Sequence, residues 1–212
     1  MLKDIRNIDA SIGKLQAAKH ANIVQIFGAF QESIYADFIQ VAAERLDQNL
    51  WDYLLVNRGL PPVRQVGIVF QIASGLKYLN TLEPNPIIHG RLTPGNVMVG
   101  SGGKTFKVSD FGQATYLINA IPCNKWYSAP EILLHLRDKK EIFLHNNSDV
   151  FSLGVIMLEV ATGRKPTGSH DAVHYSDQQV RKILKNDLER LFPFCLSDAV
   201  RFLEHCTIYY KE

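Results

Sequence analysis

The sequence predicts an α+β protein in which a small β-rich part precedes a larger, mostly helical part. Two observations support this class. β-Branched and aromatic residues are concentrated in two early runs, 23–30 and 33–41, whereas later segments repeat apolar residues every three or four positions. With 212 residues, of which 46% are apolar, the chain is long enough to bury a substantial core.

The first elements are a helix, a strand pair and a short helix. Apolar residues recur at helical spacing between residues 8 and 20, which predicts one helix there. The two β-rich runs follow and are separated by Gln31-Glu32, which predicts an antiparallel pair. Residues 47–57 then predict a short helix, because three apolar residues share one of its faces: Leu50, Tyr53 and Leu54.

The clearest amphipathic pattern in the chain covers residues 63–80. Its apolar positions predict a core-facing stripe made of Val66, Val69, Ile72, Leu76 and Leu79. Residues 150–161 are apolar nearly all round, so we expect a helix buried in the middle of the domain. Ser148-Asp149 is expected to cap the start of that helix, and Gly163 to end it.

The segment 87–112 combines a short strand end, a polar loop and a hairpin that turns at Ser101-Gly102-Gly103. Asn96 lies on the loop, and Asp110 follows the hairpin. Both side chains carry oxygen ligands of the type that magnesium prefers. We expect the strands to bring these two residues together.

Polar residues with few regular signals follow at 113–128, which favours a functional loop. A short helix is expected to open at Ala129-Pro130-Glu131. Two further helices are expected over 178–185 and 197–210.

Five motifs in order resemble the protein kinase family. HGRLTPGN is similar to the kinase catalytic loop H-R-D-L-x-x-x-N, and the D-F-G and A-P-E motifs follow it. The segment SDVFSLGVIMLEVATGRKP resembles the buried helix of the tyrosine-kinase and tyrosine-kinase-like groups, and HANIVQIFGAF resembles the end of helix C with the next strand. The resemblance implies one kinase-like domain over 1–212, with a partial N-lobe at 1–45 and a C-lobe at 46–212, incomplete at both ends.

The resemblance assigns residues to a nucleotide site that uses ATP and Mg²⁺. It places Asn96 and Asp110 as metal ligands, and Asn96, Asp110 and Met98 at the cofactor, with an equal alternative that Asn96 and Asp110 are structural hydrogen-bonding residues. Arg91 stands where the family has its catalytic aspartate. A guanidinium stays charged and has no lone pair that accepts a proton, so Arg91 cannot act as a base. It could instead attract a phosphate or pair with Asp110.

Other family positions are also altered. Gly90 replaces an arginine that holds a phosphorylated activation loop, and Thr93 replaces a lysine beside the transferred phosphate. Ser11 falls where the helix C glutamate is expected, and the chain contains no G-x-G-x-x-G loop. By contrast, the positions that join the two lobes are suitably filled, although we favour simple core packing as their explanation because apolar residues at such spacing are usually core: Leu15, Ile26, His89 and Phe111, anchored by Asp149.

These substitutions predict a pseudokinase that acts by protein recognition or allostery and binds ATP and Mg²⁺ weakly or not at all. One alternative is an active Ser/Thr or Tyr kinase, and a second is a non-functional fragment from an incomplete gene model. A net charge of +2 without basic clusters argues against nucleic acid, so protein partners in signalling are expected. The three cysteines and the lack of a signal peptide or membrane span favour the cytoplasm.

Overall fold

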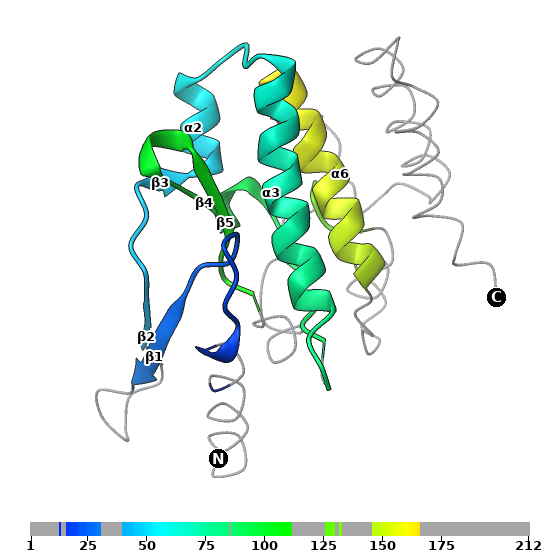
Figure 1. Cartoon of the computed structure of the whole chain (residues 1–212). Coiled ribbons are helices and arrows are strands. Elements are labelled where there is room, and N and C mark those ends of the chain that lie inside the picture. The colour runs from blue at the N-terminus through cyan, green and yellow to red at the C-terminus, as the bar shows by residue number, and fades with distance from the viewer. Residues whose placement is uncertain are drawn as a thin grey trace, which may run out of the picture.

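The computed structural model describes residues 13, 16–30, 40–84, 86–111, 126–129, 132 and 146–165. In this part of the chain, two small antiparallel sheets lie beside a layer of helices, in which α3 and α6 run side by side (Figure 1). The strands are β1 (Ile26–Phe30), β2 (Gln40–Ala43), β3 (Gln48–Asn49), β4 (Val97–Gly100) and β5 (Thr105–Val108). The helices are α2 (Leu50–Val56), α3 (Pro62–Asn80) and α6 (Asn146–Thr162), with single turns η1 (Pro94–Asn96) and η2 (Ser101–Gly103). The predicted α+β class is confirmed.

The predicted early strand pair is antiparallel, as β1 pairs with β2 from Ile26 opposite Ala43 to Phe30 opposite Gln40. The end of the second strand was predicted too early, at Val41, because β2 continues to Ala43. Its predicted start falls within residues 31–39, which lie outside the described residues. Of the predicted helix at 8–20, the described residues before Ala18 are helical, whereas residues 18–20 are not.

The helix predicted at 47–57 is α2, and it begins at Leu50 because Asn49 caps it. The Asn49 side chain accepts a hydrogen bond from the Asp52 N–H at 3.0 Å, satisfying one exposed donor of the first turn. Gln48 and Asn49 form strand β3 against β4, so the predicted start at residue 47 was wrong. The predicted buried face is confirmed at Leu50, Tyr53 and Leu54.

Helix α3 confirms the amphipathic segment, but part of its predicted core face was wrong. Val66 is 68% exposed, whereas Ile68 is 1% exposed. The buried face is chosen by the contacts of α3 with α6 and β5, and it comprises Ile68, Ile72, Gly75, Leu76 and Leu79. Gly75 permits a close approach, because a Cβ there would lie 2.5 Å from the backbone oxygen of Asn22.

The predicted hairpin of segment 87–112 is confirmed. β4 pairs with β5 from Val97 opposite Val108 to Gly100 opposite Thr105, and η2 joins them. Gly102 and Gly103 have φ values of 61° and 86°, a left-handed conformation that favours glycine. This turn brings the segment after β5 back beside the loop before β4.

Helix α6 begins at Asn146, so the prediction that Ser148-Asp149 would cap it was wrong. Both residues lie in its first turn and are buried. The helix ends at Thr162, and Gly163 follows with φ 63°, as the sequence predicted. Its burial is confirmed at several apolar positions, namely Phe151, Val155, Ile156 and Val160.

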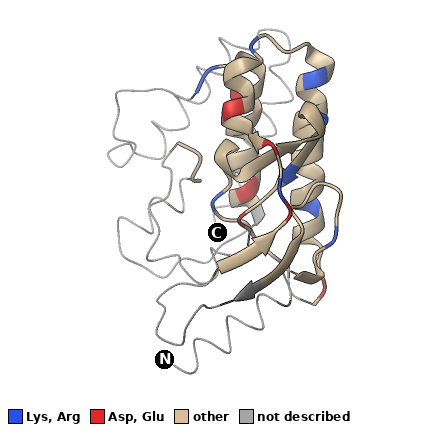
Figure 2. Ribbon diagram, turned by 90° about the vertical axis from the view of Figure 1, so that its left-hand side faces the viewer, with Lys and Arg blue, Asp and Glu red and all other residues tan. Residues whose placement is uncertain are grey.

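Several predicted segments lie largely outside the described residues. These are the loop at 113–128 before residue 126, the helices at 178–185 and 197–210, and the helix opened by Ala129-Pro130-Glu131, of which Ile132 is helical. None of the described helices has the length and apolar character needed to cross a membrane. In Figure 2, Lys and Arg are interspersed with Asp and Glu over the described part of the chain.

Candidate functional site

Asp149 holds the loop that precedes β4. Its buried carboxylate accepts the His89 N–H at 2.8 Å through Oδ2 and the Gly90 N–H at 2.7 Å through Oδ1. Burial raises the pKa of Asp149 to about 6, although the two N–H donors favour the charged form. A carboxylate on a core helix therefore fixes the backbone of residues 89 and 90.

His89 is fully buried and links this loop to the end of β5. Its Nε2 lies 2.9 Å from the Ser109 carbonyl oxygen, and its Nδ1 lies 3.3 Å from the Arg91 N–H. A carbonyl only accepts, so Nε2 carries the proton and Nδ1 accepts from Arg91. Burial, with a smaller contribution from the charge of Arg91, lowers the pKa of His89 to about 4 even though its hydrogen bond to the Ser109 carbonyl raises it, so the ring is neutral near pH 7.

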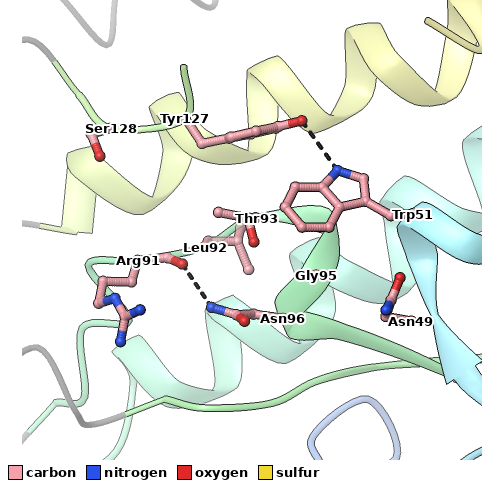
Figure 3. A pocket seen from close by; sticks show the side chains of 9 residues that line it. All are labelled: Asn49, Trp51, Arg91, Leu92, Thr93, Gly95, Asn96, Tyr127 and Ser128. Atoms are coloured by element: carbon pink, nitrogen blue, oxygen red, sulfur yellow. Dashed lines mark hydrogen bonds between the residues drawn. The ribbon is translucent and has the colours of Figure 1, made fainter. Parts of the chain in front are cut away.

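Gly90 and Arg91 continue the loop. Gly90 has φ 69°, a left-handed conformation that costs other residue types free energy. The half-buried Arg91 accepts a hydrogen bond from Asn96 Nδ2 at 2.9 Å through its backbone oxygen, as Figure 3 shows. This bond fixes the amide orientation of Asn96.

The structure brings the segments of Asn96 and Asp110 together. The backbone oxygen of Asn96 accepts the Ser109 N–H at 2.9 Å and the Ser109 hydroxyl at 3.0 Å, so Asn96 is joined to the neighbour of Asp110. Asp110 is exposed and has φ 55°, which aspartate tolerates better than most residues. Among the described residues, no ion pair joins Arg91 to Asp110, and no three His, Cys, Asp or Glu side chains form a metal-type group.

Met98, predicted at the cofactor, lies on β4 between two buried valines. It is opposite Asn49 on β3 and Lys107 on β5. Because side chains alternate along a strand, the partly exposed Met98 points away from the face that buries Val97 and Val99. Its role at a cofactor stays a prediction.

Of the four positions predicted to join the two lobes, three lie in the part of the chain that the structure describes. Ile26, His89 and Phe111 are 9%, 0% and 1% exposed. Leu15 lies outside the described residues. These burials agree equally with ordinary core packing.

A pocket of about 370 Å³ lies beside the loop. It is lined by the start of α2, by residues 91–93, 95 and 96, and by Tyr127 and Ser128. Figure 3 shows Arg91 toward one end and Trp51 toward the other, with Thr93 and Asn96 between them. Asp110 and Met98 are not among the described lining residues.

Sequence reasoning missed Trp51 as a pocket residue. Trp51 Nε1 donates to the Tyr127 hydroxyl at 3.4 Å, and the two rings meet edge to face at 6.3 Å. The Tyr127 hydroxyl in turn donates to Glu159 Oε2 at 2.5 Å. Burial raises the pKa of both Tyr127 and Glu159. The Lys165 Nζ lies 4.7 Å from the centroid of the Trp51 ring, a cation–π contact. The part of the pocket wall formed by Trp51 and Tyr127 is therefore fixed by Glu159 and Lys165 as well as by its own hydrogen bond.

Comparison with known proteins agrees with this arrangement. The chain is 30% identical over 210 residues to human serine/threonine-protein kinase tousled-like 1, covering 91% of this chain and 27% of that protein. It is 32% identical over 192 residues to serine/threonine-protein kinase VIK of Arabidopsis thaliana, covering 84% of this chain and 41% of that protein. The chain thus spans well under half of these relatives. The sequence model of the protein kinase domain family matches residues 3–209 of this chain, and the chain therefore belongs to that family.

Proposed function

We propose that this chain is a pseudokinase, a protein kinase domain that acts by recognising protein partners rather than by transferring phosphate. The observation that carries the proposal is Arg91. Its backbone is tied to His89 and Asn96, and its guanidinium has no site that accepts a proton from a substrate hydroxyl. A missing general base typically lowers the rate by about 10²- to 10⁴-fold.

Two further substitutions in the same loop support the proposal. Gly90 offers no side chain to hold a phosphorylated segment, and Thr93 brings no positive charge to a transferred phosphate. Losses within one catalytic unit are strongly non-additive, so losing a single key part can cost about as much activity as losing the whole unit. We therefore assign the loop a binding role.

Asn96 and Asp110 remain as oxygen donors, and this favours residual nucleotide binding. Hydrogen bonds of Ser109 hold their segments together, which suits Mg²⁺ when phosphate and water supply its other ligands. When bound, ATP with Mg²⁺ supplies the phosphoryl group on which family members act. In this chain, Asn96 and Asp110 would position the metal.

The alternative function is that of an active kinase. It is favoured by the retained pair Asn96 and Asp110 and by the printed names of the relatives, which are serine/threonine-protein kinases. Membership of the tyrosine-kinase or tyrosine-kinase-like groups is argued from the α6 segment alone, and a cytoplasmic location from the three cysteines and the lack of a signal peptide or membrane-span pattern; both stay predictions.

A phosphotransfer assay decides between the two functions. The purified chain is incubated with Mg²⁺ and γ-labelled ATP, with a generic protein substrate, beside Asp110→Ala. We expect no label above the level of Asp110→Ala. Transfer by the unmodified chain that Asp110→Ala abolishes would refute the pseudokinase proposal.

Nucleotide binding is measured separately as a shift in melting temperature. At a ligand concentration of about 100 times Kd, stabilisation is about 2.7 kcal/mol. For a chain of this size, that corresponds to a rise of roughly 5–11 °C. An unchanged melting temperature at millimolar Mg-ATP, in both the chain and Asp110→Ala, would contradict residual nucleotide binding.

A further inference from the structure

Helix α3 carries an exposed apolar row, which we call the outer stripe. Its members are Val63, Val66 and Phe70, which are 87%, 68% and 71% exposed. They follow the helical spacing i, i+3 and i+7, so they are neighbours on one face of α3. The opposite face packs on α6 and β5 (Figure 1). Single exposed apolar residues are common, whereas a contiguous row of them is typical of an interaction surface.

The relief of the outer stripe suits a second helix. Gly67 lies four residues after Val63 and three before Phe70, so it is a neighbour of both on the helix surface. Nothing lies within 4 Å of the position that a Cβ of Gly67 would take. Large side chains beside an open glycine form the ridges and grooves on which helices pack. An extended peptide would instead pair with the edge of a sheet.

The chain around the outer stripe carries positive charge only. Residues 53–82, all of which the structure describes, contain three cations and no Asp or Glu: Arg58, Arg64 and Lys77. The exposed Arg58 precedes α3, and the exposed Lys77 lies in its last turn. Lys77 is 14 positions after Val63, about four helical turns, and so it shares the face of the outer stripe. The stripe therefore lies between two exposed cations.

This charge distinguishes between the occupants that could cover the outer stripe. A two-fold pair of identical faces would place cations opposite cations, with no acid in residues 53–82 to offset them, which disfavours a second copy of the chain. Segments that bind anionic lipid typically cluster about four to eight Lys or Arg, whereas three are spread over this segment. A helix with carboxylates beside an apolar row would cover the stripe and offset its charge.

We propose that the outer stripe docks an acidic amphipathic helix of a partner protein. Apolar residues of that helix, spaced i, i+3 or i+4 and i+7, lie on the outer stripe, and its carboxylates pair with Arg58 and Lys77. The stripe spans about 10 Å from Val63 to Phe70, and the face continues for about 21 Å to Lys77. A partner helix of about four turns therefore covers the whole face.

The outer stripe is separate from the pocket beside the loop. None of its three residues, nor Arg58 or Lys77, is among the described lining residues of that pocket. Docking on α3 therefore does not depend on the chemistry of position 91. It goes beyond the proposed function, because it would serve an active kinase domain as well as an inactive one.

The test measures binding of three pools of fluorescent helical peptides to the purified chain by fluorescence polarisation. The acidic pool has mixed large apolar residues at i, i+3, i+4 and i+7, with Glu at the positions beside that row. The basic pool has Lys in place of each Glu, and the scrambled pool keeps the acidic composition without the apolar row. We expect the acidic pool to bind at least about tenfold more tightly than either other pool, because it alone matches both the stripe and its charge.

Variants locate the binding on α3. Val66→Glu places an acid within the stripe, and Phe70→Ala removes its aromatic side chain; each should lower affinity for the acidic pool by at least about tenfold. Lys77→Glu should weaken binding of the acidic pool and strengthen binding of the basic pool, a reversal that a merely structural defect would not produce. Arg45→Glu is the matched control, since Arg45 is an exposed arginine between β2 and β3, outside α3. Melting temperatures of all variants exclude unfolding as the cause.

Several outcomes would overturn the inference. These are failure of the acidic pool to bind, equal binding of the acidic and basic pools, and unchanged affinity in a folded Val66→Glu. Binding to phosphatidylserine vesicles, or formation of a dimer, would also overturn it if Val66→Glu abolished that association, because lipid or a second copy would then cover the stripe. Phosphotransfer by the same preparation would refute the proposed function alone, and failure of the acidic pool would refute this inference alone.

Discussion

Replacing Asp149 by asparagine is expected to make unfolding of the protein strongly dependent on pH between pH 7 and pH 4. In the unmodified chain, two buried groups of one hydrogen-bonded network titrate in this range with opposite effects on stability. Asp149 accepts the backbone N–H of His89 at 2.8 Å, and both side chains are at most 1% exposed. Asp149→Asn removes the titration of residue 149 and leaves the titration of His89.

The first titration is that of Asp149. Burial raises its pKa from the ordinary 3.8 to about 6, so the folded protein binds this proton more tightly than the unfolded chain does. The resulting stability is fully present below pH 3.8 and is lost as pH rises through 6. Lowering the pH from 7 to 4 should therefore add about 2 kcal/mol to the free energy of unfolding.

The second titration is that of His89, and it has the opposite sign. Burial lowers its pKa from 6.5 to about 4, so the folded protein favours the neutral ring. The resulting stability is present above pH 6.5 and is lost as pH falls through 4. Lowering the pH from 7 to 4 should remove about 3 kcal/mol, which nearly cancels the gain from Asp149.

Urea unfolding at pH 7, 5 and 4 measures this balance. Between pH 7 and pH 4, Asp149→Asn should lose about 2 kcal/mol more stability than the unmodified chain. His89→Gln should change in the opposite direction, by about 3 kcal/mol relative to the unmodified chain. Groups that titrate elsewhere are common to all three proteins and drop out of the difference. Parallel pH profiles for the three proteins would refute the assignment of these two titrations.

Three glycine substitutions give further predictions for urea unfolding. Gly90→Ala should lower stability by about 1 kcal/mol, because φ of 69° is unfavourable for alanine; an unchanged midpoint would contradict the left-handed loop. Gly67→Ala, within α3 and with nothing within 4 Å of the added Cβ, should raise stability by about 0.5–1 kcal/mol, and it serves as the matched control. Gly75→Ala should destabilise by at least about 1–3 kcal/mol, because its Cβ would lie 2.5 Å from the Asn22 oxygen; a neutral result would refute that close approach.

Local patterns predicted the elements better than they predicted the faces of those elements. The spacing in residues 63–80 located α3, yet it placed exposed Val66 in the core and omitted buried Ile68. Several apolar stripes fit one helix, and the neighbours that pack on it decide which stripe is buried. The start of α6 at Asn146 was also missed. Ser148-Asp149 has the residue types of a helix cap, but the local sequence does not show whether the helix begins before it.

The candidate site was predictable where its residues lie close together in the chain. Arg91, Asn96 and Asp110 were identified from one segment, and the hairpin turn at Gly102 and Gly103 brings its two ends together. Trp51 could not be found in this way, because its partner Tyr127 is 76 positions away. Periodic patterns in a sequence indicate local elements and not contacts between residues so far apart in the chain.

The α+β class, the family motifs and the chemistry of position 91 follow from local spacing and from the functional groups present, without any tertiary contact. A guanidinium cannot accept a proton in any fold. Two features could be seen only in the folded chain: Asp149 holds the backbone of a loop 60 positions earlier, and Arg91 and Trp51 line one pocket. Those contacts depend on how α6 and α2 pack around the hairpin, and packing is a property of the whole folded chain.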